Sequence, residues 1–241
     1  MAGKRRLIFG LCCGPEKAEE ALQSGFSYVE LPAAPLAEGA DYSGLPVAAT
    51  NLFFPGGLSL YSDRAACEAH ARKVISRAIE LGIPLMVIGS GGVRKAPDGD
   101  DPAQREAEFC DFVAEMQDEF PQVSLAPESL NRSETNIGND YGPFAVTLAH
   151  RGCSATLDAY HVGLEPGFSG WEGRIPVLPK HLHLASPSRV MPEPDCPFLL
   201  SLFVALNQMG YSGTASFEGN WTKPLGQCLA NLNSLADQAG M

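Results

Sequence analysis

The chain is short of positive charge. Among its 241 residues, 17 are Lys or Arg and 28 are Asp or Glu, so the formal net charge at pH 7 is -11. A surface of this sign repels phosphate backbones and anionic lipids and releases no counterions from them. Nucleic acid and the membrane surface are therefore excluded as expected partners.

Long apolar segments and paired cysteine motifs are also missing. No stretch approaches the roughly 18 apolar residues that a membrane-spanning helix needs. The apolar run before Gly14 has only about six residues, fewer than the core of a signal peptide. The seven cysteines are odd in number and never form a CxxC spacing, so no disulfide framework or zinc knuckle is expected. These absences predict a cytoplasmic protein with reduced thiols.

Short apolar runs are what the chain has in abundance. Hydrophobic residues make up 45% of it and charged residues 19%, which is enough material for a folded core. Eight runs rich in β-branched residues are bounded by Gly, Pro or polar residues, as expected for strands buried in a parallel sheet. They cover residues 6–12, 28–32, 46–53, 84–90, 123–129, 153–161, 180–186 and 214–219. At about 30 residues per run, the spacing matches one βα repeat and predicts a single-domain (β/α)8 TIM barrel over residues 1–241.

Helix start and stop signals lie between most of these runs. Asp63 or its neighbour Ser62 can cap a helix that ends at Gly82, and Asp101 before Pro102 can open another. An apolar helix is predicted over 197–209, with a glycine directly after it. The connection over 31–45 is rich in Pro, Gly and Ala, so we expect no regular helix there.

Polar residues close four of the later runs. Glu128, Asp158, His183 and Glu218 follow one another at intervals of about one βα unit. Taken singly, such a carboxylate is more often a helix cap or a solvated group than a metal ligand. In a barrel, however, all four would enter one mouth, where three carboxylates would repel each other without a cation. Mixed oxygen and nitrogen ligands suit Mn²⁺, Mg²⁺, Co²⁺ or Zn²⁺. His181 shares the side-chain direction of His183, so one of the two could be a packed core histidine.

These residues stand in ordered motifs that resemble a known family. The segments 128–134, 158–161, 181–183 and 217–218, together with Arg189, resemble the metal-dependent sugar isomerases and epimerases of the xylose isomerase-like TIM barrels. The resemblance is strongest to the ketose 3-epimerase and hydroxypyruvate isomerase branch, the sugar phosphate isomerase/epimerase family. Segments 26–30, 80–84 and 89–91 extend it more weakly into the first half.

The resemblance implies a set of roles. The implied ligands of one divalent metal ion (Mn, Co, Mg or Zn) are Glu128, Asp158, His183 and Glu218. Glu128 and Glu218 would also act as the acid/base pair that moves a proton through a metal-stabilised cis-enediolate. The residues that would hold the substrate are Glu134, His161 and Arg189. The implied partner is a small-molecule carbohydrate, and the implied activity is that of an isomerase or epimerase.

Several alternatives stay open from the sequence. A polyol-ketone dehydratase of the same superfamily would use the same metal and base, and a non-catalytic sugar-binding barrel is a third hypothesis. A nuclease with a trinuclear zinc cluster needs many histidines, whereas this chain has five and carries the wrong charge for DNA. The sequence leaves open the sugar and its phosphorylation, the choice between epimerase, isomerase and dehydratase, the metal, and homo-oligomer formation.

Overall fold

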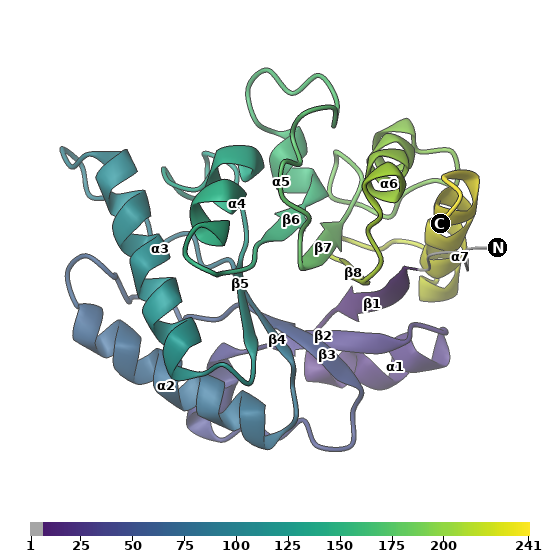
Figure 1. The fold of residues 1–241 in the computed structure, drawn as a ribbon. Helices are drawn as coiled ribbons and strands as arrows, with labels where there is room; N and C mark the ends of the chain where they lie inside the picture. Colours follow the sequence, from purple (N-terminus) through teal and green to yellow (C-terminus); the bar gives the residue numbers. More distant parts are fainter. Residues whose placement is uncertain (1–6) are drawn as a thin grey trace.

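The computed structural model describes residues 7–241, which form a (β/α)8 barrel. Eight parallel strands make one sheet in the order β5-β4-β3-β2-β1-β8-β7-β6, and the helices surround it (Figure 1). The ring closes between β5 and β6 through an isolated bridge that pairs Glu128 with Thr156, and the Thr156 hydroxyl donates to the Ala126 carbonyl at 3.1 Å. The predicted fold class is therefore confirmed.

Each of the eight predicted runs contains one strand. The first run was expected to begin at Arg6, which lies outside the described residues together with the rest of the basic N-terminal start. The strands are β1 Ile8–Cys12, β2 Tyr28–Pro32, β3 Val47–Asn51, β4 Leu85–Ile88, β5 Ser124–Pro127, β6 Thr156–Asp158, β7 His181–Leu184 and β8 Thr214–Phe217.

The helices begin and end at the signals that the sequence carries. The Asp63 side chain accepts from the Ala66 amide and starts α2, and Asp101 does the same for α3 with Pro102 in the first turn. Gly210 ends α6 in the left-handed conformation with φ of 83°. The helices are α1 Ala18–Gln23, α2 Arg64–Glu80, α3 Pro102–Glu119, α4 Tyr141–Ala149, α5 Ala159–Gly163, α6 Pro197–Met209 and α7 Leu225–Gln238, and two short 3-10 helices are η1 Pro15–Lys17 and η2 Ala34–Glu38.

The connection from β2 to β3 is irregular, as predicted. It contains only the 3-10 helix η2 among the described elements, and this helix ends at Gly39 with φ of 90°. A second α-helix is thus replaced by a short segment whose Leu36 is buried in the main core and which packs against α2.

The inside of the barrel is polar on one side. A small apolar cluster of Ala49, Leu85 and Ala126 joins β3, β4 and β5, whereas the residues reaching inward from β2, β7 and β8 form hydrogen bonds. Gly10 on β1 makes room for this network, because a Cβ there would lie 2.1 Å from the Tyr28 ring. The Tyr28 hydroxyl thereby reaches across β1 to the Ser216 hydroxyl at 3.0 Å.

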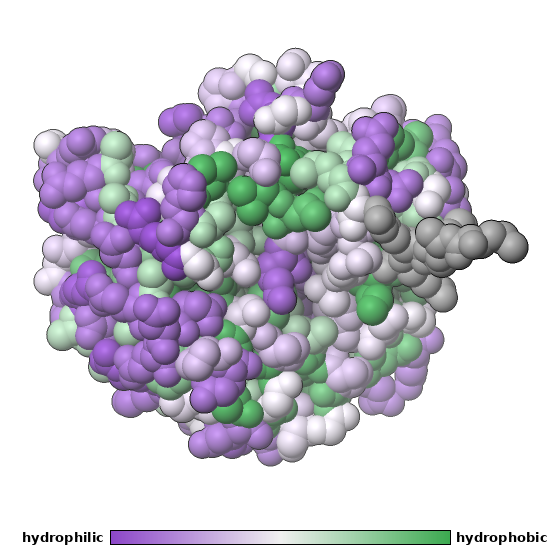
Figure 2. Space-filling view, viewed as in Figure 1, coloured by the Kyte–Doolittle hydropathy of each residue, from purple (hydrophilic) through white to green (hydrophobic). Residues whose placement is uncertain are grey.

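The outer surface over α2 and α3 is hydrophilic (Figure 2). Arg72 of α2 pairs with Glu119 of α3 at 2.9 Å, and Arg64 pairs with Glu68 at 2.9 Å. Exposed ion pairs of this kind each add at most about 1 kcal/mol to the free energy of unfolding. They therefore keep this side of the molecule solvated but stabilise the fold little. Among residues 7–241, no helix combines the length and the apolar character needed to cross a bilayer.

Candidate metal centre

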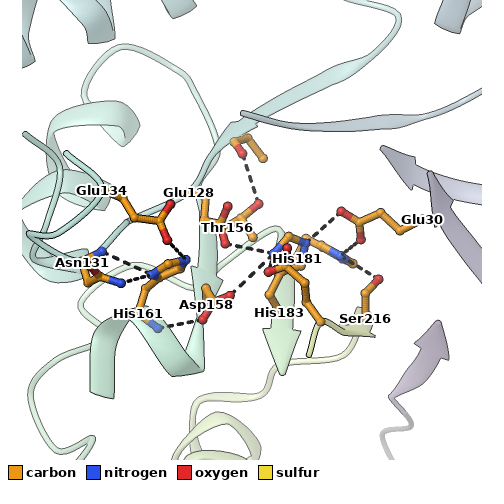
Figure 3. A network of polar contacts seen from close by, with 12 residues as sticks. Glu30, Glu128, Asn131, Glu134, Thr156, Asp158, His161, His181, His183 and Ser216 are labelled. Carbon is orange, nitrogen blue, oxygen red and sulfur yellow. Dashed lines mark hydrogen bonds and ion pairs between the residues drawn. The ribbon is translucent and has the colours of Figure 1, made fainter. Parts of the chain in front are cut away.

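The four predicted ligands come together at the carboxyl ends of four successive strands. Glu128 directly follows β5, Asp158 ends β6, His183 lies in β7 and Glu218 directly follows β8. One donor atom from each residue lies within 4.8 Å of the others; Glu128, Asp158 and His183 are labelled in Figure 3. The βα period thus places side chains far apart in the chain in one cluster.

His183 is at the centre of the cluster. Its Nδ1 lies 3.0 Å from Glu128 Oε1, 3.3 Å from Glu218 Oε2 and 3.8 Å from Asp158 Oδ2. The other three residues surround one nitrogen, and only Glu218 is partly exposed to solvent. The opening of the cluster is therefore on the Glu218 side.

The charges of these residues are strongly coupled. Burial, reinforced by the neighbouring Glu128 and Glu218 carboxylates, raises the pKa of Asp158 well above its usual value. Burial alone would lower the pKa of His183, but Glu30, Cys12 and the cluster carboxylates outweigh it and raise that pKa well above its usual value. For Glu218, burial is outweighed by His183 and Arg189, which lower its pKa to about 2. Without a metal, the protonated His183 therefore balances part of the carboxylate charge, a role that a divalent cation would take over.

A divalent cation fits this donor set. Three carboxylates and one imidazole nitrogen are the hard and borderline ligands that Mn²⁺, Co²⁺, Mg²⁺ and Zn²⁺ accept. The buried Glu218 Oε2 accepts no hydrogen bond of good geometry in the described structure, although His183 Nδ1 and Arg189 Nη2 each lie 3.3 Å away, so it keeps a lone pair for a cation. A metal would be held by Glu128, Asp158, His183 and Glu218.

Two neighbours determine where Glu128 can lie. Gly89, directly after β4, lies so close that a Cβ on it would be 2.7 Å from Glu128 Oε2. The buried Arg94 guanidinium packs over the Phe109 ring and donates from Nη2 to the Glu128 carbonyl at 2.6 Å. Arg94 thus fixes the backbone of Glu128, and the missing side chain of Gly89 leaves room for its carboxylate.

Asp158 has two functions in the structure. Its Oδ1 accepts from the His161 amide at 2.8 Å and caps the N-terminus of α5, while its Oδ2 faces His183. The cap and the ligand hypothesis for this residue are therefore compatible, because each uses a different oxygen.

The three residues expected to hold substrate lie beside the cluster. Arg189 lies 3.3 Å from Glu218 Oε2 through Nη2 and 3.7 Å from Glu134 Oε1 through Nη1. Glu134 Oε1 lies 3.9 Å from His161 Nε2. Arg189 also packs over the Tyr160 ring, and its backbone has the left-handed φ of 56°, a strained conformation of the kind found at functional sites.

Asn131 adds a contact that the motifs alone did not assign. Its amide nitrogen Nδ2 and its backbone nitrogen lie 2.7 Å and 3.3 Å from His161 Nδ1. Because both are donors, Nδ1 accepts and the ring proton lies on Nε2, on the Glu134 side. Burial lowers the pKa of His161, which favours this neutral form. His161 therefore presents an N–H group toward the mouth.

A cavity of about 290 Å³ adjoins the cluster at the mouth. Glu218 and Arg189 from the second half of the chain line the cavity, as do Cys13, Asn51 and Leu52 from the first half. The Oδ1 atom of Asn51 is buried and has no hydrogen-bond partner in the described structure. Such a wall can accept a hydrogen bond from a small polar ligand.

Glu30 is the functional candidate that the sequence reasoning passed over. It appeared only in a weakly matching segment, yet it lies on β2 with no exposed surface and contacts both His181 and His183 (Figure 3). A lone carboxylate in an apolar strand requires a buried partner, and that requirement was the available signal. Cys12 also lies within 4.8 Å of Glu30 and His183, but burial raises the pKa of its thiol well above the usual value. Cys12 is therefore protonated at neutral pH.

Fold and site together define the class of molecule as a TIM barrel with a candidate mononuclear metal centre. No protein-family model matches the chain, and a search of curated proteins finds no match.

Solved structures are similar over nearly the whole chain. These are 3-keto-D-glucoside 4-epimerase from E. coli (17% identity, TM-score 0.73, 97% of this chain and 99% of that one), D-allulose 3-epimerase from Methylomonas sp. in complex with D-allulose (20%, 0.72, 100% and 96%), and an AP endonuclease of family 2 from Brucella melitensis (19%, 0.69, 94% and 97%). At these identities the likeness establishes the shared fold, and it includes the epimerases that the motifs resemble.

Proposed function

We propose that the protein is a divalent-metal-dependent sugar isomerase or epimerase. The observation that carries the proposal is the cluster of Glu128, Asp158, His183 and Glu218, whose donor atoms lie within 4.8 Å of one another at the barrel mouth. Similar solved structures that act on sugars, as their names state, support the same class of substrate.

The chain's own residues account for the proton movements. When bound, a divalent metal would polarise a ketose carbonyl and its adjacent hydroxyl and so acidify the neighbouring C–H group. One of the two glutamates, Glu128 or Glu218, removes that proton, and the other returns one. Return to the opposite face of the same carbon inverts the centre. Return to the adjacent carbon, together with transfer of the hydroxyl proton to the former carbonyl oxygen, isomerises the sugar. His161 and Arg189 donate hydrogen bonds to substrate oxygens.

The mouth cavity favours an uncharged substrate. Arg189 is the one cationic side chain among the residues that line it, and it already faces Glu218 and Glu134. A phosphate would need further cationic partners, whereas the free Asn51 Oδ1 suits a hydroxyl group. We therefore favour a free ketose over a sugar phosphate or a keto acid.

Solvent exchange tests the proposal. Protein loaded with Mn²⁺ or Co²⁺ is incubated in D₂O with free ketoses, their phosphates and hydroxypyruvate, and deuterium in the sugar is measured. Glu128→Gln and Glu218→Gln should each lower the exchange rate by at least about 100-fold, because an amide is no base at neutral pH.

Glu165→Gln is the matched control, since Glu165 is also buried but pairs with Arg132 outside the cluster. It should exchange as the wild type does. Undiminished exchange in both cluster variants would overturn the assignment of the acid/base pair. A protein that binds no metal and exchanges no proton would instead favour the sugar-binding barrel.

A further inference from the structure

Glu30 bridges two histidines of the same strand across the inside of the barrel. Its Oε1 lies 2.8 Å from His183 Nε2 and its Oε2 lies 2.9 Å from His181 Nε2. All three side chains have no exposed surface. Since β2 and β7 are separated by β1 and β8 in the sheet, this contact crosses the barrel interior.

The contact determines which nitrogen of His183 faces the cluster. Because the Glu30 carboxylate only accepts hydrogen bonds, His183 Nε2 carries the proton that is donated to it. The other nitrogen, Nδ1, faces Glu128, Asp158 and Glu218. Without a metal it donates to Glu128 Oε1 at 3.0 Å, and it is the nitrogen whose lone pair a bound metal would take in place of that proton. Rotation of the ring would break the Glu30 bond and leave a buried carboxylate without one of its donors.

The second carboxylate oxygen of Glu30 is held by His181. The Nδ1 of His181 lies 2.7 Å from the Thr214 hydroxyl, and its Nε2 also lies 3.2 Å from the Ser216 hydroxyl. Both nitrogens of His181 are therefore used within the barrel, which separates it from the cluster. Of the two neighbouring histidines, only His183 is available as a ligand.

We propose that Glu30 is a positioning residue for the metal centre: it holds His183 in the Nε2–H tautomer and in the ring orientation that presents Nδ1 to the metal. His181, anchored by Thr214 and Ser216, holds the second oxygen of Glu30. This inference rests on the metal dependence proposed above. Partners that orient a ligand histidine in this manner typically contribute about 10- to 100-fold to metal affinity.

Metal titration by calorimetry tests the role of Glu30. Glu30→Gln keeps the size of the side chain but replaces one carboxylate oxygen with an NH2 group. One of the two histidines then faces a hydrogen-bond donor where it had an acceptor. Its dissociation constant for Mn²⁺ should rise about 10- to 100-fold, while the far-ultraviolet circular dichroism stays that of the wild type. Glu165→Gln, which alters a buried glutamate outside the cluster, should bind Mn²⁺ within twofold of the wild type.

The tautomer provides a second measurement that needs no variant. In protein labelled with ¹⁵N-histidine and loaded with Zn²⁺, long-range ¹H–¹⁵N correlations should show His183 protonated at Nε2. Protonation of His183 at Nδ1, or unchanged Mn²⁺ affinity in a folded Glu30→Gln variant, would overturn the inference. Failure of the wild type to bind either metal would instead overturn the proposed function, so the two failures are distinguishable.

Discussion

At the scale of the residue, Gly89 shows how a missing side chain serves the site. Its position after β4 leaves 2.7 Å between an added Cβ and Glu128 Oε2, so Gly89→Ala must displace the carboxylate. We expect a loss of exchange activity of about 100-fold, since a shift of about 1 Å in a reacting group can have that effect. The measurement is deuterium exchange with the protein saturated in metal.

Gly92→Ala is the matched control for this prediction. A Cβ at Gly92 would meet no atom within 4 Å, so activity should stay close to that of the wild type. Full activity in Gly89→Ala would mean that the position of Glu128 is not critical to the reaction.

At the scale of the element, α5 depends on the same residue as the cluster. Asp158→Asn preserves the cap on the His161 amide but removes the charge, whereas Asp158→Ala removes both. Each variant should lose metal in elemental analysis after dialysis. In urea unfolding of the metal-free proteins, the alanine variant should be less stable than the asparagine variant by about 1 kcal/mol, the usual contribution of a cap.

Arg189→Ala separates the metal ligands from the substrate contacts. It should retain metal after dialysis and lose affinity for the sugar, because Arg189 contacts carboxylates of the site but supplies no lone pair. Metal retained in Asp158→Asn and lost in Arg189→Ala would show that the two roles have been assigned in reverse.

At the scale of the whole molecule, metal binding should stabilise the fold. A ligand at 100 times its dissociation constant adds about 2.7 kcal/mol to the free energy of unfolding. For a chain of this size each kcal/mol shifts the melting temperature by about 2 to 4 °C, so chelation should lower it by roughly 5 to 11 °C. Differential scanning calorimetry with and without chelator measures the shift.

His183→Ala is the variant that checks the source of this shift. It lacks the one nitrogen ligand of the cluster, so added Mn²⁺ should restore its melting temperature only slightly. A melting curve of the wild type that does not respond to chelator would contradict a metal bound at this site.

Much of the barrel follows from local patterns. The eight apolar runs and the caps at Asp63 and Asp101 predicted strands and helices that the structure contains, because burial in a parallel sheet and capping are properties of adjacent residues. The convergence of Glu128, Asp158 and Glu218 was predictable for a related reason. Each stands at a strand end, and a closed barrel brings successive strand ends to one mouth.

The contacts across the barrel could not be predicted from the sequence. Glu30 and His183 are 153 positions apart, and no local pattern pairs them. Likewise, the need for glycine at Gly10 and Gly89 depends on which side chain the folded barrel places opposite each of them. The sequence by itself determined the strands, the helix caps and the residues at the mouth, because these depend on short-range periodicity. Only the tertiary structure decided which residue lies against the far side of His183, because Glu30 is a buried charge that must find its donors across the barrel.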